Sequence, residues 1–138
     1  MSTLQITAEK KEGMAFEIDT LGHAVRVDAD AAVGGQGSGP PPKSLMLTAL
    51  AGCTGMDVTA ILKKMKVTYD RFRIEITGQT REEHPKTFSS VHVRYMFSGD
   101  ELNTDKIETA AELSLGKYCP VAATLKHTAE ITHEIVVE

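Results

Sequence analysis

The stretch SLMLTALAGCTGM, residues 44–56, decides the fold, because it carries no charged side chain. With its flanks it predicts one long helix over residues 42–66. Pro42 suits the first turn, where a missing N–H costs nothing. Lys63 and Lys64 suit the last turn, since the helix dipole favours cations there. A helix that is apolar all round is buried all round.

A single thin sheet cannot cover such a helix in a chain of 138 residues. We therefore expect a second subunit to bury it. Small side chains would allow a second helix backbone to come close. They are those of Ala49, Ala51, Gly52 and Gly55.

Upstream of the helix, residues 4–8, 14–18 and 23–28 are predicted to form a three-stranded antiparallel meander. Met14, Phe16 and Ile18 alternate with polar or small residues, which is typical of a half-buried strand. Residues 34–42, GGQGSGPPP, cannot form regular structure. They are either a flexible connector or a loop that passes close to a site, since glycine lets a backbone approach a ligand.

Downstream, strands are predicted over residues 69–78 and 91–98, joined by a connection at residues 82–86. A second helix begins at Asn103 or Thr104 and ends at Cys119, because the residue before a proline avoids the helical region. A further turn or two follows over residues 120–126, and residues 131–137 form the last strand. The apolar stripe of the second helix consists of Ile107, Ala110, Ala111, Ser114 and Tyr118.

The order of these elements predicts an α+β fold with a mostly antiparallel sheet, in one domain over residues 1–138. A net charge of −4 does not suit non-specific nucleic-acid binding. Residues 44–56 are shorter than the ~20 residues that span a bilayer, and the N-terminus does not resemble a signal peptide. We therefore expect a cytoplasmic protein with neither a nucleic-acid nor a membrane partner, whose thiols stay reduced.

The two cysteines, Cys53 and Cys119, have two readings. Each is a small buried hydrophobe, or together they form a redox pair in which one thiol attacks and the other resolves. Cys119 precedes a short helix that begins at Pro120, and Lys117 lies two residues before it. Helix N-termini and nearby cations lower thiol pKa values, so we expect a lowered pKa for Cys119.

Cys53 lies among apolar residues and needs a cation to favour its thiolate. The candidate cations are Arg26, Lys43, His23, Lys117 and Lys126. Other chemistries are less well supported. The cysteines lack the CxxC spacing of zinc sites, and the glycine-rich loop lacks the Lys-Ser/Thr of a phosphate loop. We therefore expect neither a metal nor a cofactor.

Two motifs carry a family resemblance. The run GPPPKSLMLTALAGC, residues 39–53, resembles the P-x-x-L-L-x-A-L-x-x-C segment of the OsmC/Ohr family of osmotically inducible and organic-hydroperoxide-resistance proteins. The run SLGKYCPV, residues 114–121, is similar to the second-cysteine motif of that family. Asp57-Val58 and the run ILKKM, residues 61–65, fit its OsmC-like branch.

The resemblance implies an intertwined homodimer, in which mostly antiparallel sheets enclose long central helices. It implies that Cys53 is the peroxidatic thiol and Cys119 the resolving thiol, at sites on the subunit interface. The implied reaction is the reduction of organic hydroperoxides, with a dithiol, possibly lipoyl-linked in family members, as the reductant.

The sequence departs from the family pattern at one place. Family peroxidases carry a glutamate just after the helix-opening proline, and that glutamate holds an arginine beside the reactive sulfur. Here Pro42 is followed by Lys43 and Ser44, and Arg26 and Lys43 are the candidates for the activating cation. Two alternatives therefore stay open: a catalytically weak protein that binds an apolar ligand at the dimer interface, and a thiol redox sensor.

Overall fold

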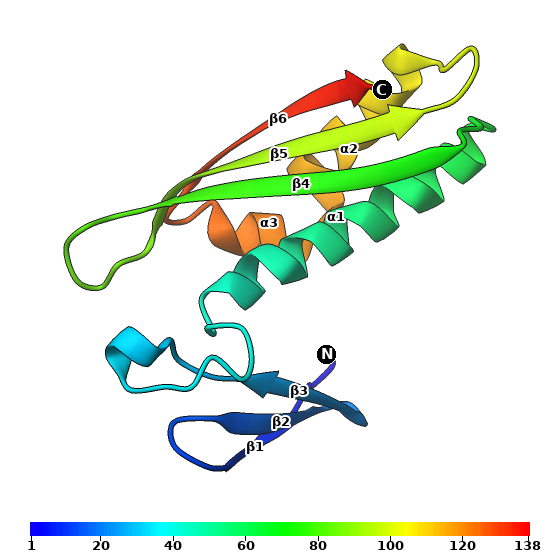
Figure 1. The fold of residues 1–138 in the computed structure, drawn as a ribbon. Helices are drawn as coiled ribbons and strands as arrows, with labels where there is room; N and C mark the ends of the chain where they lie inside the picture. The colour runs from blue at the N-terminus through cyan, green and yellow to red at the C-terminus, as the bar shows by residue number, and fades with distance from the viewer. The chain divides into compact units, whose positions relative to one another are not determined.

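The computed structural model describes residues 1–138 (Figure 1). The chain divides into two compact units, Met1–Met46 and Leu47–Glu138, and each is described by itself. That the whole chain forms a single domain stays a prediction.

The first unit holds the antiparallel meander that the sequence predicts. Its strands are β1 (Ile6–Lys10), β2 (Phe16–Thr20) and β3 (His23–Val27), in the order β1-β2-β3. The first two strands begin two residues later than predicted. For β2 the reason is the turn at Gly13, where a φ of 60° and the hydrogen bond from Ala15 N–H to the Glu12 carbonyl keep Met14 out of the strand.

The glycine-rich loop is organised around the carboxylate of Asp28. This carboxylate accepts hydrogen bonds from the N–H groups of Ala29, Gln36 and Ser38 and from the Ser38 hydroxyl. A Cβ at Gly35 would lie only 1.9 Å from the Ala29 carbonyl oxygen, so only glycine fits there. At this position glycine therefore allows the loop to pack closely against the backbone at Ala29.

The second unit contains a sheet with the order β4-β5-β6. The strands are β4 (Arg71–Thr80), β5 (Phe88–Ser98) and β6 (Glu130–Val137). β4 and β5 are antiparallel, whereas β5 and β6 are parallel. Only this last pairing in the chain is parallel, so the predicted α+β fold with mostly antiparallel sheets is confirmed.

Three helices, α1 (Ser44–Lys64), α2 (Thr104–Leu113) and α3 (Pro120–Leu125), cover one face of this sheet (Figure 1). The core lies between them and the alternate residues of β5, which are fully buried: Val91, Val93, Tyr95 and Phe97. The opposite face is polar, and Arg94 pairs there with Glu75 and Glu134. The predicted strand periodicity is thus realised as one buried and one exposed face.

Helix α1 is buried along only one stripe, formed by Leu50, Thr54, Val58 and Leu62. Met56 is 76 % exposed and Met46 is 44 % exposed. The expectation that α1 is buried all round is therefore not met within one chain. By length and composition alone α1 could cross a membrane, a test that the core helices of soluble proteins also pass.

Helix α2 begins as predicted, because the Asn103 side chain accepts a hydrogen bond from Lys106 N–H and so caps the helix. A π-helical turn, Ser114–Tyr118, then follows, closed by the bond from Cys119 N–H to the Ser114 carbonyl. The prediction that Tyr118 belongs to the apolar stripe is wrong, since this residue is 52 % exposed. The wider turn shifts the register and rotates Tyr118 away from the core.

Candidate functional site

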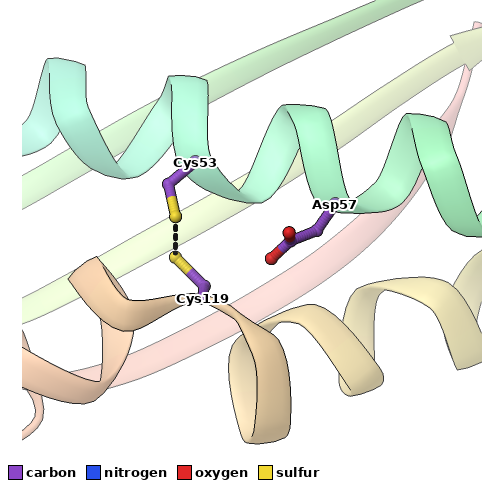
Figure 2. Close-up of side chains that lie close together, drawn as sticks. All are labelled: Cys53, Asp57 and Cys119. Atoms are coloured by element: carbon purple, nitrogen blue, oxygen red, sulfur yellow. Dashed lines mark hydrogen bonds between the residues drawn. The ribbon is translucent and has the colours of Figure 1, made fainter. Parts of the chain in front are cut away.

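The structure brings together the two thiols, which lie 66 residues apart in the sequence of the second unit. Cys53 projects from α1, and Cys119 lies between the π-helical turn and α3 (Figure 2). Their sulfur atoms are 2.9 Å apart, and the Cys119 thiol donates to the Cys53 sulfur. Both are free thiols. The local structure at Cys119 is the predicted one: its backbone is extended, with ψ of 107°, because Pro120 follows.

The environment of Cys119 differs from the prediction. Burial, and secondly the neighbouring Cys53 thiol, raise the pKa of Cys119 to about 11. The Ala122 N–H, 3.3 Å from the Cys119 sulfur, favours the thiolate but is outweighed. The predicted lowering of the Cys119 pKa is therefore wrong. Moreover, the Lys117 ammonium lies over the Tyr118 ring, 5.3 Å from its centre, and no ion pair or hydrogen bond links it to the sulfur.

A carboxylate, that of Asp57, lies beside the two thiols, and no motif in the sequence indicates a role for it. Asp57 lies four residues after Cys53 on α1, so both side chains project from the same face of the helix (Figure 2). One carboxylate oxygen of Asp57 and the two sulfurs all lie within 4.8 Å of one another. The spacing Cys-x-x-x-Asp on a predicted helix was the signal that could have revealed this contact.

A chain of buried hydroxyl groups holds Asp57 in place. The Ser114 hydroxyl donates to Asp57 Oδ2 over 2.9 Å, and Thr54 Oγ1 lies 2.7 Å from both Ser114 Oγ and the Tyr95 hydroxyl. A hydroxyl group has a single proton to donate, and Ser114 donates its proton to Asp57. The direction of the chain is then fixed: Tyr95 donates to Thr54, Thr54 to Ser114, and Ser114 to Asp57.

The activating cation of Cys53 is not identified. Arg26 lies in β3, where it binds Ser38 Oγ over 3.0 Å and pairs with Glu12. Arg26, Lys43 and His23 all belong to the first unit, so their assignment to Cys53 stays a prediction. Lys126 donates instead to the Leu115 carbonyl.

No arginine of the second unit faces the thiols. Arg73 pairs with Glu138, and Arg94 pairs with Glu75 and Glu134, all on the outer face of the sheet. Arg71 shares the exposed register of Arg73, and Arg81 binds Thr87 and the Phe88 carbonyl in the hairpin. Within this unit, the thiols and Asp57 therefore have no guanidinium partner.

Two apolar hollows flank α1. One, of about 530 Å³, opens beside the Asp57 side chain. Its other lining residues are Ala60, Ile61, Lys64, Met65, Leu113 and Tyr118. The second is an open groove of about 510 Å³ between α1 and β4, with Met56, Phe72 and Ile74 in its lining. Both offer apolar surface close to the helix that carries Cys53.

Comparisons with known proteins agree with this architecture. YhfA from Escherichia coli K12 is 29 % identical over 131 residues, which cover 94 % of this chain and 95 % of YhfA. A protein from Aquifex aeolicus VF5 superimposes with a TM-score of 0.84 at 28 % identity, covering 100 % of this chain and 99 % of that one. An organic hydroperoxide resistance protein OsmC from Legionella pneumophila shares the fold, with a TM-score of 0.74 at 16 % identity, covering 99 % of this chain and 98 % of that one.

The family comparison covers the residues that build the site. The profile of the OsmC-like protein family matches residues 35–134, which include Cys53, Asp57 and Cys119. This match extends over well more than half of the chain and agrees with the resemblance carried by the two cysteine motifs. The chain belongs to the OsmC-like protein family.

Proposed function

We propose that this protein is a thiol peroxidase that reduces organic hydroperoxides through Cys53 and Cys119. The observation that carries the proposal is the 2.9 Å separation of the two sulfur atoms. A disulfide needs about 2.05 Å, so the sulfurs have to approach by only about 0.9 Å. The likeness to a protein named for organic hydroperoxide resistance supports the same chemistry.

The exposure of the two thiols assigns their roles. Cys119 is only 3 % exposed, whereas Cys53 is half-buried. A peroxide therefore reaches Cys53 first, and the more deeply buried Cys119 acts afterwards as the resolving thiol. The raised pKa of Cys119 supports this order, because a protonated thiol is a poor nucleophile toward peroxide.

The reaction then proceeds in two balanced steps. The Cys53 thiolate attacks the O–O bond, an alkoxide leaves and takes a proton to become the alcohol, and Cys53 becomes a sulfenic acid. The Cys119 sulfur next attacks the Cys53 sulfur, the S–S bond forms, the S–O bond breaks, and water leaves. An external dithiol, lipoyl-linked or free, reduces the disulfide by exchange and returns both thiols.

The second step requires an acceptor for the Cys119 proton. Asp57 is placed for this role, since one of its oxygens lies within 4.8 Å of both sulfurs. The distance suits transfer through one water molecule or after a small side-chain shift. The hydroxyl chain from Tyr95 through Thr54 and Ser114 orients the carboxylate.

The exposed apolar surfaces support a homodimer and an apolar substrate. α1 presents Met46 and Met56 to solvent, and β1 is exposed along its whole length. Apolar surface exposed to water is unfavourable, and a second copy of the chain would remove such surfaces from water. Hydroperoxides with fatty or aromatic groups fit the apolar groove beside α1 better than hydrogen peroxide does. We place this activity in the cytoplasm, where thiols are kept reduced.

The test is consumption of cumene hydroperoxide by the reduced protein, with a dithiol to complete the cycle. We expect Cys53→Ser to abolish turnover, whereas Cys119→Ser performs one turnover and accumulates a sulfenic acid that dimedone traps. Hydrogen peroxide serves as the comparison substrate and should react more slowly. Undiminished turnover by Cys53→Ser would rule out the proposal.

A binding function is the second candidate, favoured by the arginines of the second unit, which all lie away from the thiols. In that case the apolar hollows hold a lipid-like ligand and catalysis is slow. Native mass spectrometry of the purified protein distinguishes the two: a bound acyl chain together with sluggish turnover supports binding, and an empty protein with rapid turnover supports the peroxidase. A redox sensor would instead lose both thiols to mild peroxide with an accompanying change in conformation.

A further inference from the structure

The reduced thiol pair and Asp57, to which the proposed peroxidase chemistry gives other roles, together also form a set of metal-ion donors. We propose that Cys53, Cys119 and Asp57 bind one Zn²⁺ ion in the reduced protein. The CxxC spacing of many zinc sites supplies ligands that lie close in sequence. The fold instead supplies two of them from one turn of α1 and the third from the start of α3 (Figure 2).

The geometry fits a tetrahedral ion with one open position. Zn–S bonds of about 2.3 Å and Zn–O bonds of about 2.0–2.2 Å place tetrahedral ligands roughly 3.5–3.8 Å apart. The three donor atoms already lie within 4.8 Å of one another, so a common centre is within reach of all three. The two sulfurs, now 2.9 Å apart, have to separate by about 0.9 Å, and both thiol protons leave as the ion binds.

The donors are also held as metal ligands usually are. Ser114, itself fully buried, donates to Asp57 Oδ2 and so fixes the orientation of the carboxylate. The Ala122 N–H points at the Cys119 sulfur from 3.3 Å. Such outer hydrogen bonds orient ligating groups and stabilise their negative charge. The hollow that opens beside Asp57 would supply a water molecule as the fourth ligand.

The charge of the site points to a cation. Once an ion has displaced both thiol protons, two thiolates and a carboxylate carry three negative charges, and no arginine of the second unit faces them. Lys64 lines the neighbouring hollow, but no ion pair joins it to Asp57. Two sulfurs and one oxygen select a borderline-soft ion such as Zn²⁺ over Ca²⁺ or Mg²⁺, which prefer six or more oxygen ligands.

The consequence is that the reduced protein has a zinc-bound and a metal-free form, whereas the oxidised protein carries a disulfide. In the zinc-bound form both sulfurs are occupied, and they are withheld from peroxide. In the disulfide form neither sulfur is a thiolate, so the ion cannot bind. Zinc binding is therefore confined to the reduced protein.

The test uses Co²⁺ as a spectroscopic probe of the full-length reduced protein under anaerobic conditions. We expect one Co²⁺ per chain, with a thiolate-to-cobalt charge-transfer band and the intense visible bands of tetrahedral Co²⁺, both abolished by Zn²⁺. Cys53→Ser and Cys119→Ser should lose the charge-transfer intensity. Asp57→Asn should weaken Zn²⁺ binding more than tenfold in competition with a chromophoric chelator. Asp100→Asn, an exposed turn position, is the matched control and should leave the affinity unchanged.

The disulfide form of the unaltered protein is a control that does not depend on whether the variants fold. It has the same sequence and should give no charge-transfer band. The proposal is overturned by weak octahedral spectra, by equal binding to the oxidised protein, or by equal affinity of Asp57→Asn. None of these measurements involves peroxide, so their outcome is independent of whether the protein proves to be a peroxidase.

Discussion

Replacement of Thr54 by valine probes the buried hydroxyl chain that orients Asp57. Thr54 Oγ1 makes two bonds of 2.7 Å, to Tyr95 and to Ser114, and all three residues are fully buried. In Thr54→Val the Tyr95 hydroxyl keeps no partner, which costs about 1–3 kcal/mol, and the lost bond to Ser114 costs about 1 kcal/mol more. We therefore expect Thr54→Val to lower the free energy of unfolding by about 2–4 kcal/mol.

Tyr95→Phe should cost less, about 1 kcal/mol, because Thr54 still donates to Ser114. The double variant has no orphaned tyrosine hydroxyl. Its cost should therefore fall below the sum of the two single costs by about 1–2 kcal/mol. This non-additivity is specific to a direct contact between the two hydroxyl groups.

The assay is urea unfolding of the four proteins, at one fixed protein concentration because a dimer is expected. In a thermal unfolding experiment on the same proteins, the single Thr54→Val change should lower the melting temperature by roughly 6–12 °C in a chain of this size. Additive costs to within about 0.5 kcal/mol, or a cost of Thr54→Val below about 0.5 kcal/mol, would refute the hydroxyl chain.

Three further predictions concern the rest of the chain. The Ser38 hydroxyl and backbone N–H groups lower the pKa of Asp28 to about 2, so its contribution to stability is present above about pH 4 and is lost as the pH falls toward 2. Limited proteolysis of residues 34–42 should increase over that range, and Asp28→Asn should be cleaved readily at every pH. Because the pKa of Cys119 is about 11, its alkylation by iodoacetamide, followed by peptide mass spectrometry, should be slow at pH 7.5 and rise about tenfold per pH unit up to that pKa. Gly78→Ala should destabilise the protein by about 1–3 kcal/mol in urea unfolding, since the new Cβ would lie 2.7 Å from the Phe88 ring. Unchanged stability of this variant would show that the ring moves aside freely.

Local sequence signals predicted most of the elements. Alternation identified the strands, the proline after Cys119 ended the second helix, and Asn103 capped it. Strand ends were less accurate, as in β2, because a turn at Gly13 extends one residue further than its glycine indicates. The π-helical turn at residues 114–118 was missed, since an i→i−5 bond leaves no periodic pattern in five residues. Tyr118 was therefore assigned to the wrong face.

Only part of the candidate site could be predicted from the sequence. The two cysteines were singled out by their motifs, but Asp57 was not, because a single aspartate on a helix usually faces solvent. The Cys119 pKa was predicted in the wrong direction. A helix N-terminus and a nearby lysine are visible in the sequence, whereas the burial that outweighs them arises from packing against α1 and the sheet.

The sequence by itself determined that this chain forms an α+β fold with one long apolar helix and two notable thiols, since helix and strand periodicity and proline constraints act over a few residues. Only the tertiary structure decided that a sulfur from α1, a sulfur from the start of α3 and the Asp57 carboxylate meet within 4.8 Å. The physical reason is that distances between residues 66 positions apart are set by how the helices pack on the sheet, and so are burial and charge at the meeting point.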